Sequence, residues 1–116
     1  MRELKAKAAA PRVAALASAV AASCAADKHR DAAKAYAELK AVADADLPLS
    51  AFESMLRMYD RLLMTASAEG VFIDALAAGH APTEEICWSL ARAFERAGEA
   101  GRADKVLAYM ETRGML

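Results

Sequence analysis

Four arginines with a repeated spacing are the residues of this chain whose chemistry is easiest to interpret. Arg57 and Arg61 stand four residues apart, and Arg92 and Arg96 repeat this pair 35 residues later. Residues four apart share one face of a helix. Guanidinium groups on such a face could contact nucleic-acid phosphates, and counterion release would make that binding salt-dependent. The alternative is a solvated face on which each arginine pairs with nearby acids such as Glu53.

No pattern typical of a catalytic or metal site stands out beside these arginines. His29 and His80 are isolated, so neither an HExxH sequence nor a set of Cys and His ligands is present. Cys24 and Cys87 form no CxxC pair, and they lie far apart in the helical stacking derived below. The sequence therefore predicts a non-enzymatic protein without metal or cofactor, in which a surface rather than a pocket carries the function.

Length and composition indicate one helical domain. The chain has 116 residues, a formal net charge of −1 and 57% hydrophobic residues, and much of that hydrophobic fraction is alanine, the best helix former. The near-neutral charge excludes a strongly basic nucleic-acid-binding domain, but it leaves a local basic stripe open.

The N-terminal part allows two interpretations. Basic residues precede an uncharged run over residues 13–26, which fits either a retained structural helix or a targeting segment. The run is too short and too weakly apolar to span a bilayer, which needs about 20 apolar residues. We therefore expect no membrane-spanning segment here.

An internal repeat organises the rest of the chain. When residues 49–81 are written above residues 84–116, identical residues align at six positions: Ser54/Ser89, Arg57/Arg92, Arg61/Arg96, Ala68/Ala103, Val71/Val106 and Gly79/Gly114. Apolar residues recur at helical spacing in both copies. The pattern predicts an all-α solenoid of helix-turn-helix hairpins with a 35-residue repeat, because such hairpins bury their faces only by stacking.

Capping residues divide the chain into units. Ser50 with Glu53 forms a predicted capping box, Ser67 is a candidate cap for the next helix, and Thr83 for the one after. Glycines that suit helix C-termini follow. Pro11 and Pro48 bracket the first full hairpin, and Pro11 is expected to end the helix before it. The expected units are residues 1–11 as the tail of a preceding helix, 12–48 as a degenerate repeat, and 49–83 and 84–116 as two better repeats.

The last unit, ICWSLARAFERAGEAGRADKVLAYMETRGM over residues 86–115, resembles a pentatricopeptide repeat. It has the family's Ala-Gly turn at residues 97–98 and its later apolar and glycine positions. The unit before it matches at Phe52, Ala68, Phe72, Gly79 and Pro82. The tetratricopeptide repeat, with a 34-residue unit, is the rival family. The glycine typical of that family is replaced by Leu56, and the period of 35 favours the first resemblance.

The resemblance implies a surface of first helices that binds single-stranded RNA in an organelle, one base per repeat. The family's base-reading positions fall on Glu53, Trp88 and Thr83, which are not a standard reading set, although Trp88 could stack on a base. Arg61 and Arg96 fall where the family carries a basic residue near phosphates. The resemblance also implies a mitochondrial or chloroplast location.

Two functions remain open from the sequence. The first is a module that binds single-stranded RNA or works within an organellar ribonucleoprotein. The second is a structural or accessory subunit that uses the same helices for protein–protein contacts in a large organellar assembly. The candidate residues of either surface are Arg57, Arg61, Arg92, Arg96, Glu53, Trp88 and Thr83.

Overall fold

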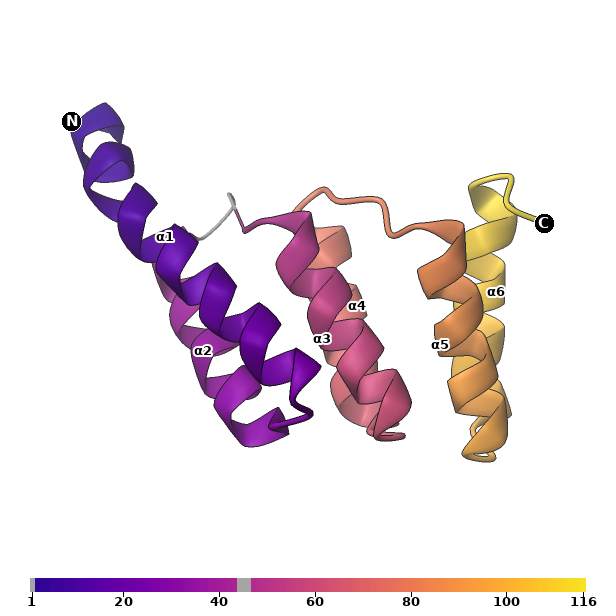
Figure 1. Cartoon of the computed structure of the whole chain (residues 1–116). Helices are drawn as coiled ribbons and strands as arrows, with labels where there is room; N and C mark the ends of the chain where they lie inside the picture. Colours follow the sequence, from indigo (N-terminus) through magenta and orange to yellow (C-terminus); the bar gives the residue numbers. More distant parts are fainter. Residues whose placement is uncertain (1, 44–46) are drawn as a thin grey trace.

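The structure is a computed structural model that describes residues 2–43 and 47–116, with side chains for residues 11–43 and 47–116. Within these residues the chain forms helices only (Figure 1). The helices are α1 (Arg2–Ala25), α2 (His29–Ala43), α3 (Leu49–Arg61), α4 (Thr65–Ala77), α5 (Glu84–Arg96) and α6 (Ala100–Thr112). The prediction of an all-helical fold is confirmed.

The helices pack as three consecutive pairs that stand side by side (Figure 1). α1 packs on α2, α3 on α4, and α5 on α6, while α1, α3 and α5 also contact one another in sequence. The second helix of each of the first two pairs also contacts the first helix of the next pair. The molecule measures 45 × 30 × 17 Å with a radius of gyration of 14.8 Å. A compact domain of this length has a radius of gyration of about 13 Å, so the row is an elongated slab.

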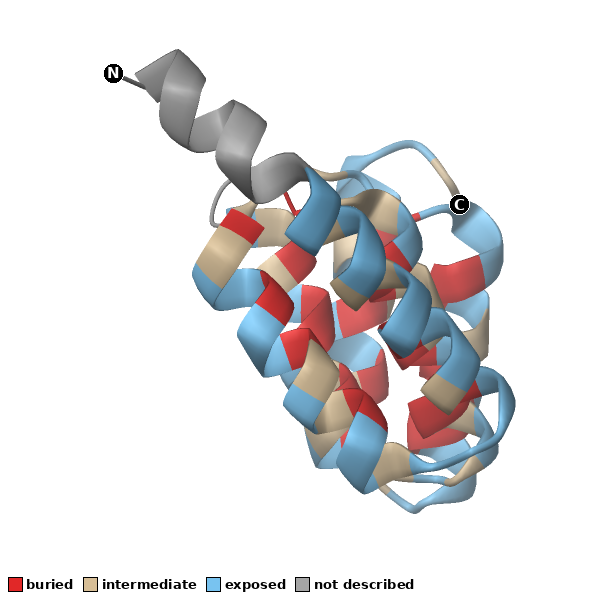
Figure 2. Ribbon diagram, turned by 60° about the vertical axis from the view of Figure 1, so that its left-hand side comes forward, coloured by how far each residue is buried: buried red, intermediate tan, exposed pale blue. Residues whose placement is uncertain are grey.

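The hydrophobic core runs the length of the row and centres on α3. Phe52, Met55 and Met58 are at most 1% exposed, and α3 contacts four other helices. The ring of Phe52 packs edge-on against Tyr36 of α2, with centroids 6.1 Å apart. Figure 2 shows the buried residues on the facing sides of the helices and the exposed ones on their outer sides. The apolar spacing of the sequence therefore places each helix in the row.

Five of the helices, α1, α3, α4, α5 and α6, end in the same hydrogen-bonded turn. The turn residue has a positive φ and donates to the carbonyl three residues back, and the next residue donates to the carbonyl five back. Asp27, Leu63 and Gly98 hold this position after α1, α3 and α5. Gly79 and Gly114 hold it after α4 and α6, as the sequence predicted. Counting from these residues, α3 aligns with α1 at an offset of 36 residues, and α5 with α3 at 35.

The helix starts agree with the sequence in one of three cases. The hydroxyl of Thr83 accepts a hydrogen bond from the N–H of Ile86 and caps α5, as predicted. The capping box at Ser50 is wrong, because α3 follows directly on Pro48, whose extended backbone precedes the first turn. The cap at Ser67 is also wrong, because α4 begins at Thr65 with Met64 in the N-cap position, three residues before Ser67.

A helix break at Pro11 was expected and is absent. α1 continues through Pro11, which has no N–H for the intrahelical hydrogen bond at that position. The predicted boundary between residues 1–11 and 12–48 therefore lies inside one helix. No helix among the described residues is long and apolar enough to cross a membrane.

The second hairpin is closed by a contact between its two ends. His80, after α4, has its Nε2 2.7 Å from the carbonyl oxygen of Leu47, before α3. Because a carbonyl oxygen only accepts, Nε2 is the donor. The His80 ring also packs against Phe52, with centroids 5.4 Å apart. The chain thus enters and leaves this hairpin at neighbouring points.

Candidate functional site

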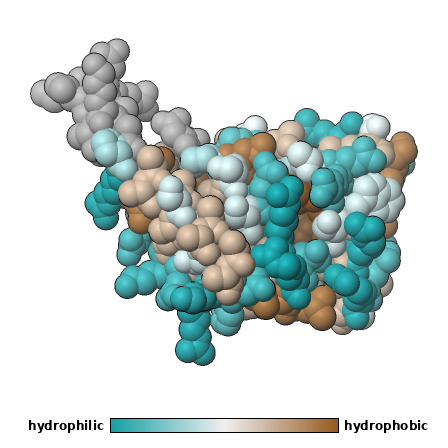
Figure 3. All heavy atoms as spheres, in the orientation of Figure 1, coloured by the Kyte–Doolittle hydropathy of each residue, from teal (hydrophilic) through white to brown (hydrophobic). Residues whose placement is uncertain are grey.

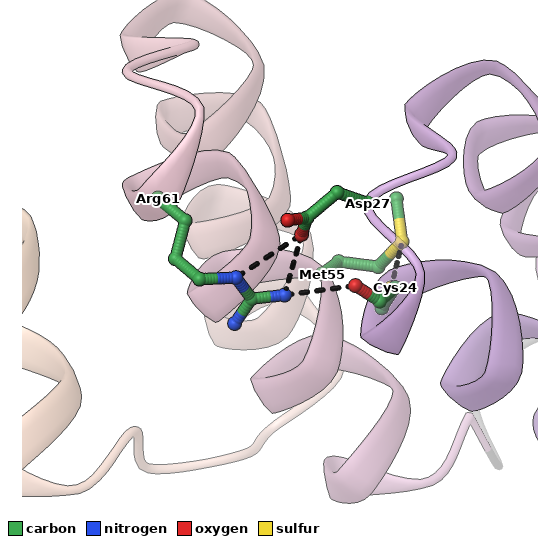
Figure 4. Close-up of polar contacts among 4 residues, drawn as sticks. All are labelled: Cys24, Asp27, Met55 and Arg61. Atoms are coloured by element: carbon green, nitrogen blue, oxygen red, sulfur yellow. Dashed lines mark hydrogen bonds and ion pairs between the residues drawn. The ribbon is translucent and has the colours of Figure 1, made fainter.

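Arg61, at the end of α3, reaches across to the turn that follows α1 (Figure 4). Its Nε and Nη2 atoms donate to one carboxylate oxygen of Asp27 at 3.1 and 2.9 Å. Nη2 also donates to the carbonyl oxygen of Cys24 at 2.8 Å. The guanidinium therefore links two successive hairpins.

Arg96, at the end of α5, makes the corresponding contact one hairpin further on. Its Nη2 donates to Oδ1 of Asp60 at 3.3 Å. In the register of the turns, Asp60 occupies in α3 the position that Cys24 occupies in α1. The two repeated arginines therefore share one structural task, the connection of each first helix to the preceding one.

The other two arginines are more loosely held. Arg57 faces Glu53 of its own helix with a nitrogen–oxygen distance of 3.7 Å. Arg92 is exposed, and among the described side chains it has no ion-pair partner within 4 Å. We call the exposed side of α3 and α5 that carries Arg57, Arg61, Arg92 and Arg96 the arginine face. Figure 3 shows hydrophilic side chains gathered there, whereas α1 presents a paler, alanine-rich surface.

A shallow hollow of about 580 Å³ lies on the arginine face between α3 and α5. Its lining comprises Asp60, Ser89, Arg92, Glu95 and Arg96. A smaller hollow of about 160 Å³ adjoins it, with Glu85 among its lining residues. We call the two hollows together the groove, and its lining mixes positive and negative side chains.

The three expected base-reading residues differ in how far their side chains are available to a ligand. The Thr83 hydroxyl is taken up by the cap of α5. The Glu53 side chain is only 24% exposed and faces Arg57. Trp88 is 37% exposed, and its indole N–H donates to Glu84 at 3.3 Å. Of the three expected residues, only Trp88 presents a surface on which a ligand could stack.

The second helices carry connections that the sequence did not reveal. Asp74 of α4 accepts from the Tyr36 hydroxyl and from Lys40 Nζ of α2, both at 2.9 Å. Arg102 of α6 lies 3.3 Å from a carboxylate oxygen of Glu69 on α4. In the sequence, each of these ion pairs is visible only as an acidic and a basic residue about one repeat apart. Many exposed residues that form no ion pair have the same spacing.

Burial and neighbouring charge shift the pKa of several groups between the helices. Burial raises the pKa of the Cys24 thiol, and Arg61 lowers it in part. Burial likewise raises the pKa of Cys87. The pKa of Tyr36 is raised strongly by burial and by its hydrogen bond to Asp74. The thiols are therefore held in the neutral, unreactive form.

Among the residues that the structure describes, no three His, Cys, Asp or Glu side chains gather as a metal site would require. Comparison of the chain with protein-family models, with curated proteins and with solved structures gives no match.

Proposed function

We propose that this chain is a non-catalytic helical-repeat module that binds a protein partner through the arginine face, as an accessory part of a larger assembly. The observation that carries the proposal is that Arg61 and Arg96 form ion pairs within the chain. Both arginines neutralise acids of their own chain, Asp27 and Asp60, and so leave little positive charge for a polyanion. The mixture of positive and negative side chains in the groove suits the mixed surface of a protein better than a run of phosphates.

The proposal includes a solenoid of three helical hairpins, α1–α2, α3–α4 and α5–α6, in which the last two repeat with a 35-residue period. Its support is the recurrence of one contact in equivalent places, since Arg61 and Arg96 each reach the preceding first helix. The repeated turn at Asp27, Leu63 and Gly98 supports the same register. In a solenoid the stacked first helices form an extended surface, which is the usual binding surface of such proteins.

The burial and the hydrogen bonding of the two cysteines and His80, side chains suited to nucleophilic or acid–base chemistry, support a non-catalytic function. Cys24 and Cys87 are buried thiols with raised pKa values. His80 donates to a backbone carbonyl and packs against Phe52, so its ring has a structural role. A nucleophile beside a base, which acyl or phosphoryl transfer needs, has no candidate among these groups.

Single-stranded RNA is the second candidate, and one observation favours it. Trp88 and Arg92 lie four residues apart on α5 and are both exposed, so one aromatic ring and one free guanidinium share a helix face. Stacking with charge contact is a common way to hold single strands. This reading keeps the resemblance to pentatricopeptide repeats and its mitochondrial or chloroplast location.

Binding to RNA is tested with a mixed-sequence single strand at two salt concentrations. We expect no binding at low salt for the parent chain. Arg92→Glu is the test variant, and Arg30→Glu, an exposed arginine on α2, is the matched control. Salt-dependent binding that Arg92→Glu abolishes and Arg30→Glu retains would replace the protein proposal by the RNA candidate.

Binding to protein is tested with a photo-crosslinking amino acid at Ser89, which lines the groove, and at the exposed Ala37 of α2 as control. We expect a discrete cross-linked protein from position 89 only. The purified partner should then bind the parent chain at least tenfold more tightly than the Arg92→Glu variant. Equal labelling from both positions, or equal affinities, would contradict the proposal.

A further inference from the structure

The two junctions between hairpins can be compared position by position. The turn residues Asp27, Leu63 and Gly98 define equivalent places after α1, α3 and α5. In this register the connecting arginines Arg61 and Arg96 are themselves equivalent. Any difference between their surroundings is therefore a difference between the junctions.

The polar connections of the first junction are the stronger ones. Arg61 makes three hydrogen bonds, to Asp27 and to the Cys24 carbonyl, between 2.8 and 3.1 Å. Arg96 makes one, at 3.3 Å, to Asp60. Arg96 makes fewer hydrogen bonds because the equivalent turn residue differs. Asp27 offers a carboxylate to Arg61 in the first junction, whereas Leu63 at the same position has no side-chain acceptor for Arg96.

The packing between the first helices differs in the same direction at the two junctions. α1 packs more extensively on α3 than α5 does. A buried contact between Cys24 Sγ and Met55 Sδ, 3.5 Å apart, fills the first junction. The position of Cys24 is taken in the second junction by the charged Asp60, which borders both hollows between α3 and α5.

We infer that the row of hairpins has a hinge at the junction of α3 with α5. The third hairpin (α5–α6) rotates about this hinge relative to the first two hairpins (α1–α4), which move as one rigid body. The Arg96–Asp60 pair holds this hinge on the side of the first helices. On the side of the second helices, α4 and α6 are joined by the Arg102–Glu69 pair and by the Phe72–Tyr109 ring contact. The groove on the arginine face therefore widens or narrows as the hinge moves. This inference concerns the chain alone and goes beyond the proposed function, because no partner takes part in it.

Three equivalent, exposed positions on the second helices allow a direct test. Ala37, Ile73 and Ala108 are each the ninth residue of their helix, and all three are exposed. Nitroxide labels on an Ala37→Cys/Ile73→Cys variant report the first junction. Labels on an Ile73→Cys/Ala108→Cys variant report the second. The parent chain, whose two native thiols are buried, controls for background labelling.

Pulsed electron paramagnetic resonance then gives the distance distribution for each pair. We expect the second distribution to be at least twice as wide as the first. Leu63→Asp copies Asp27 and should narrow the second distribution, because it offers Arg96 a second carboxylate. Leu63→Gly, the matched control, relieves the same backbone conformation without adding an acceptor and should leave the width unchanged.

Each outcome decides the inference. Equal distribution widths for the two label pairs, measured without a substitution at Leu63, would overturn it. The inference would also be overturned if Leu63→Asp did not narrow the distance distribution of the Ile73/Ala108 label pair. The same holds if Leu63→Gly narrowed that distribution as much as Leu63→Asp does. Circular dichroism of the labelled variants verifies that all of them retain the helical fold.

Discussion

Arg61 and Asp27 join the first two hairpins through one carboxylate oxygen, which accepts from both Nε and Nη2 of the guanidinium. The two side chains remain 47% and 45% exposed, so solvent screens their attraction. The fixed geometry is the main effect of the pair, since the same guanidinium also reaches the Cys24 carbonyl. The repeated arginine is thus first a connector between helices.

Removing the Asp27 charge should lower stability slightly. Asp27→Asn retains a residue that tolerates positive φ, so its effect isolates the ion pair. We expect a loss of about 0.5–1 kcal/mol in the free energy of unfolding, as for other exposed pairs. Urea titration measures it, with Glu38→Gln on the exposed side of α2 as control. The loss should shrink at high salt, and a salt-independent loss would contradict the ion-pair explanation.

Replacing Leu63 by glycine should stabilise the chain. Leu63 has a φ of 54°, a left-handed conformation in which an ordinary side chain is strained. Its side chain is 51% exposed, so little packing is lost. We expect a gain of about 1 kcal/mol from the relieved strain, measured as a raised midpoint of thermal unfolding. The control Ala37→Gly, inside α2, should lower that midpoint instead. A lower midpoint for Leu63→Gly would show that the leucine side chain matters more than its backbone.

Truncating Phe52 should be far more damaging than changing any surface residue. Its side chain is 1% exposed in α3 and contacts both Tyr36 and His80. Phe52→Ala should cost about 3–5 kcal/mol by lost burial and a residual cavity. Phe52→Leu serves as the milder variant, and its denaturant midpoint should lie between those of the parent and Phe52→Ala. Similar midpoints for all three would contradict the central place of α3.

Stability should fall in alkaline solution because of Tyr36. Its pKa in the folded chain is raised above the ordinary value of 10.0 by burial and by the hydrogen bond to Asp74. Above about pH 10 the folded chain therefore holds a proton that the unfolded chain releases, and stability declines as pH rises. Below that pH the contribution is fully present. Tyr36→Phe should be less stable than the parent at pH 7, and the difference should shrink above pH 10. Chemical denaturation across this range measures it, and a constant difference would contradict the assignment.

Both cysteines should react with a thiol reagent only when the chain opens. Cys24 and Cys87 are 3% and 0% exposed, and burial raises the pKa of each thiol. We expect labelling at pH 7 to be slow in buffer and rapid in denaturant. Mass spectrometry distinguishes the two sites. Fast labelling of Cys87 alone in buffer would indicate that α5 opens independently.

Local signals in the sequence were enough for the helices and for several of their ends. Thr83 with its following acids and the glycines at 79 and 114 act through the nearest turn of chain, so their roles could be predicted. Ser50 failed as a cap because Pro48 sets the start of α3. The break at Pro11 failed because a proline lowers helix stability without forbidding a helix.

The connections across hairpins were not predictable in the same way. The arginine repeat was visible, but its partners Asp27 and Asp60 depend on how one hairpin sits on the next. The change of offset from 36 to 35 residues amounts to a single residue, and no local residue pattern predicts it. The sequence therefore suggested a row of positively charged arginines. That Asp27 and Asp60 neutralise two of them became clear only from the packing of the hairpins.

The hydrogen bond between His80 and the Leu47 carbonyl has a further consequence for how such a chain can change in length. Since the backbone enters and leaves the middle hairpin at one place, residues 47–80 form a cassette with adjoining ends. We expect a second copy of this cassette, inserted beside the first, to add one hairpin with its own pair of arginines. The contact thus makes the middle hairpin a segment whose two ends can join the same stretch of neighbouring chain.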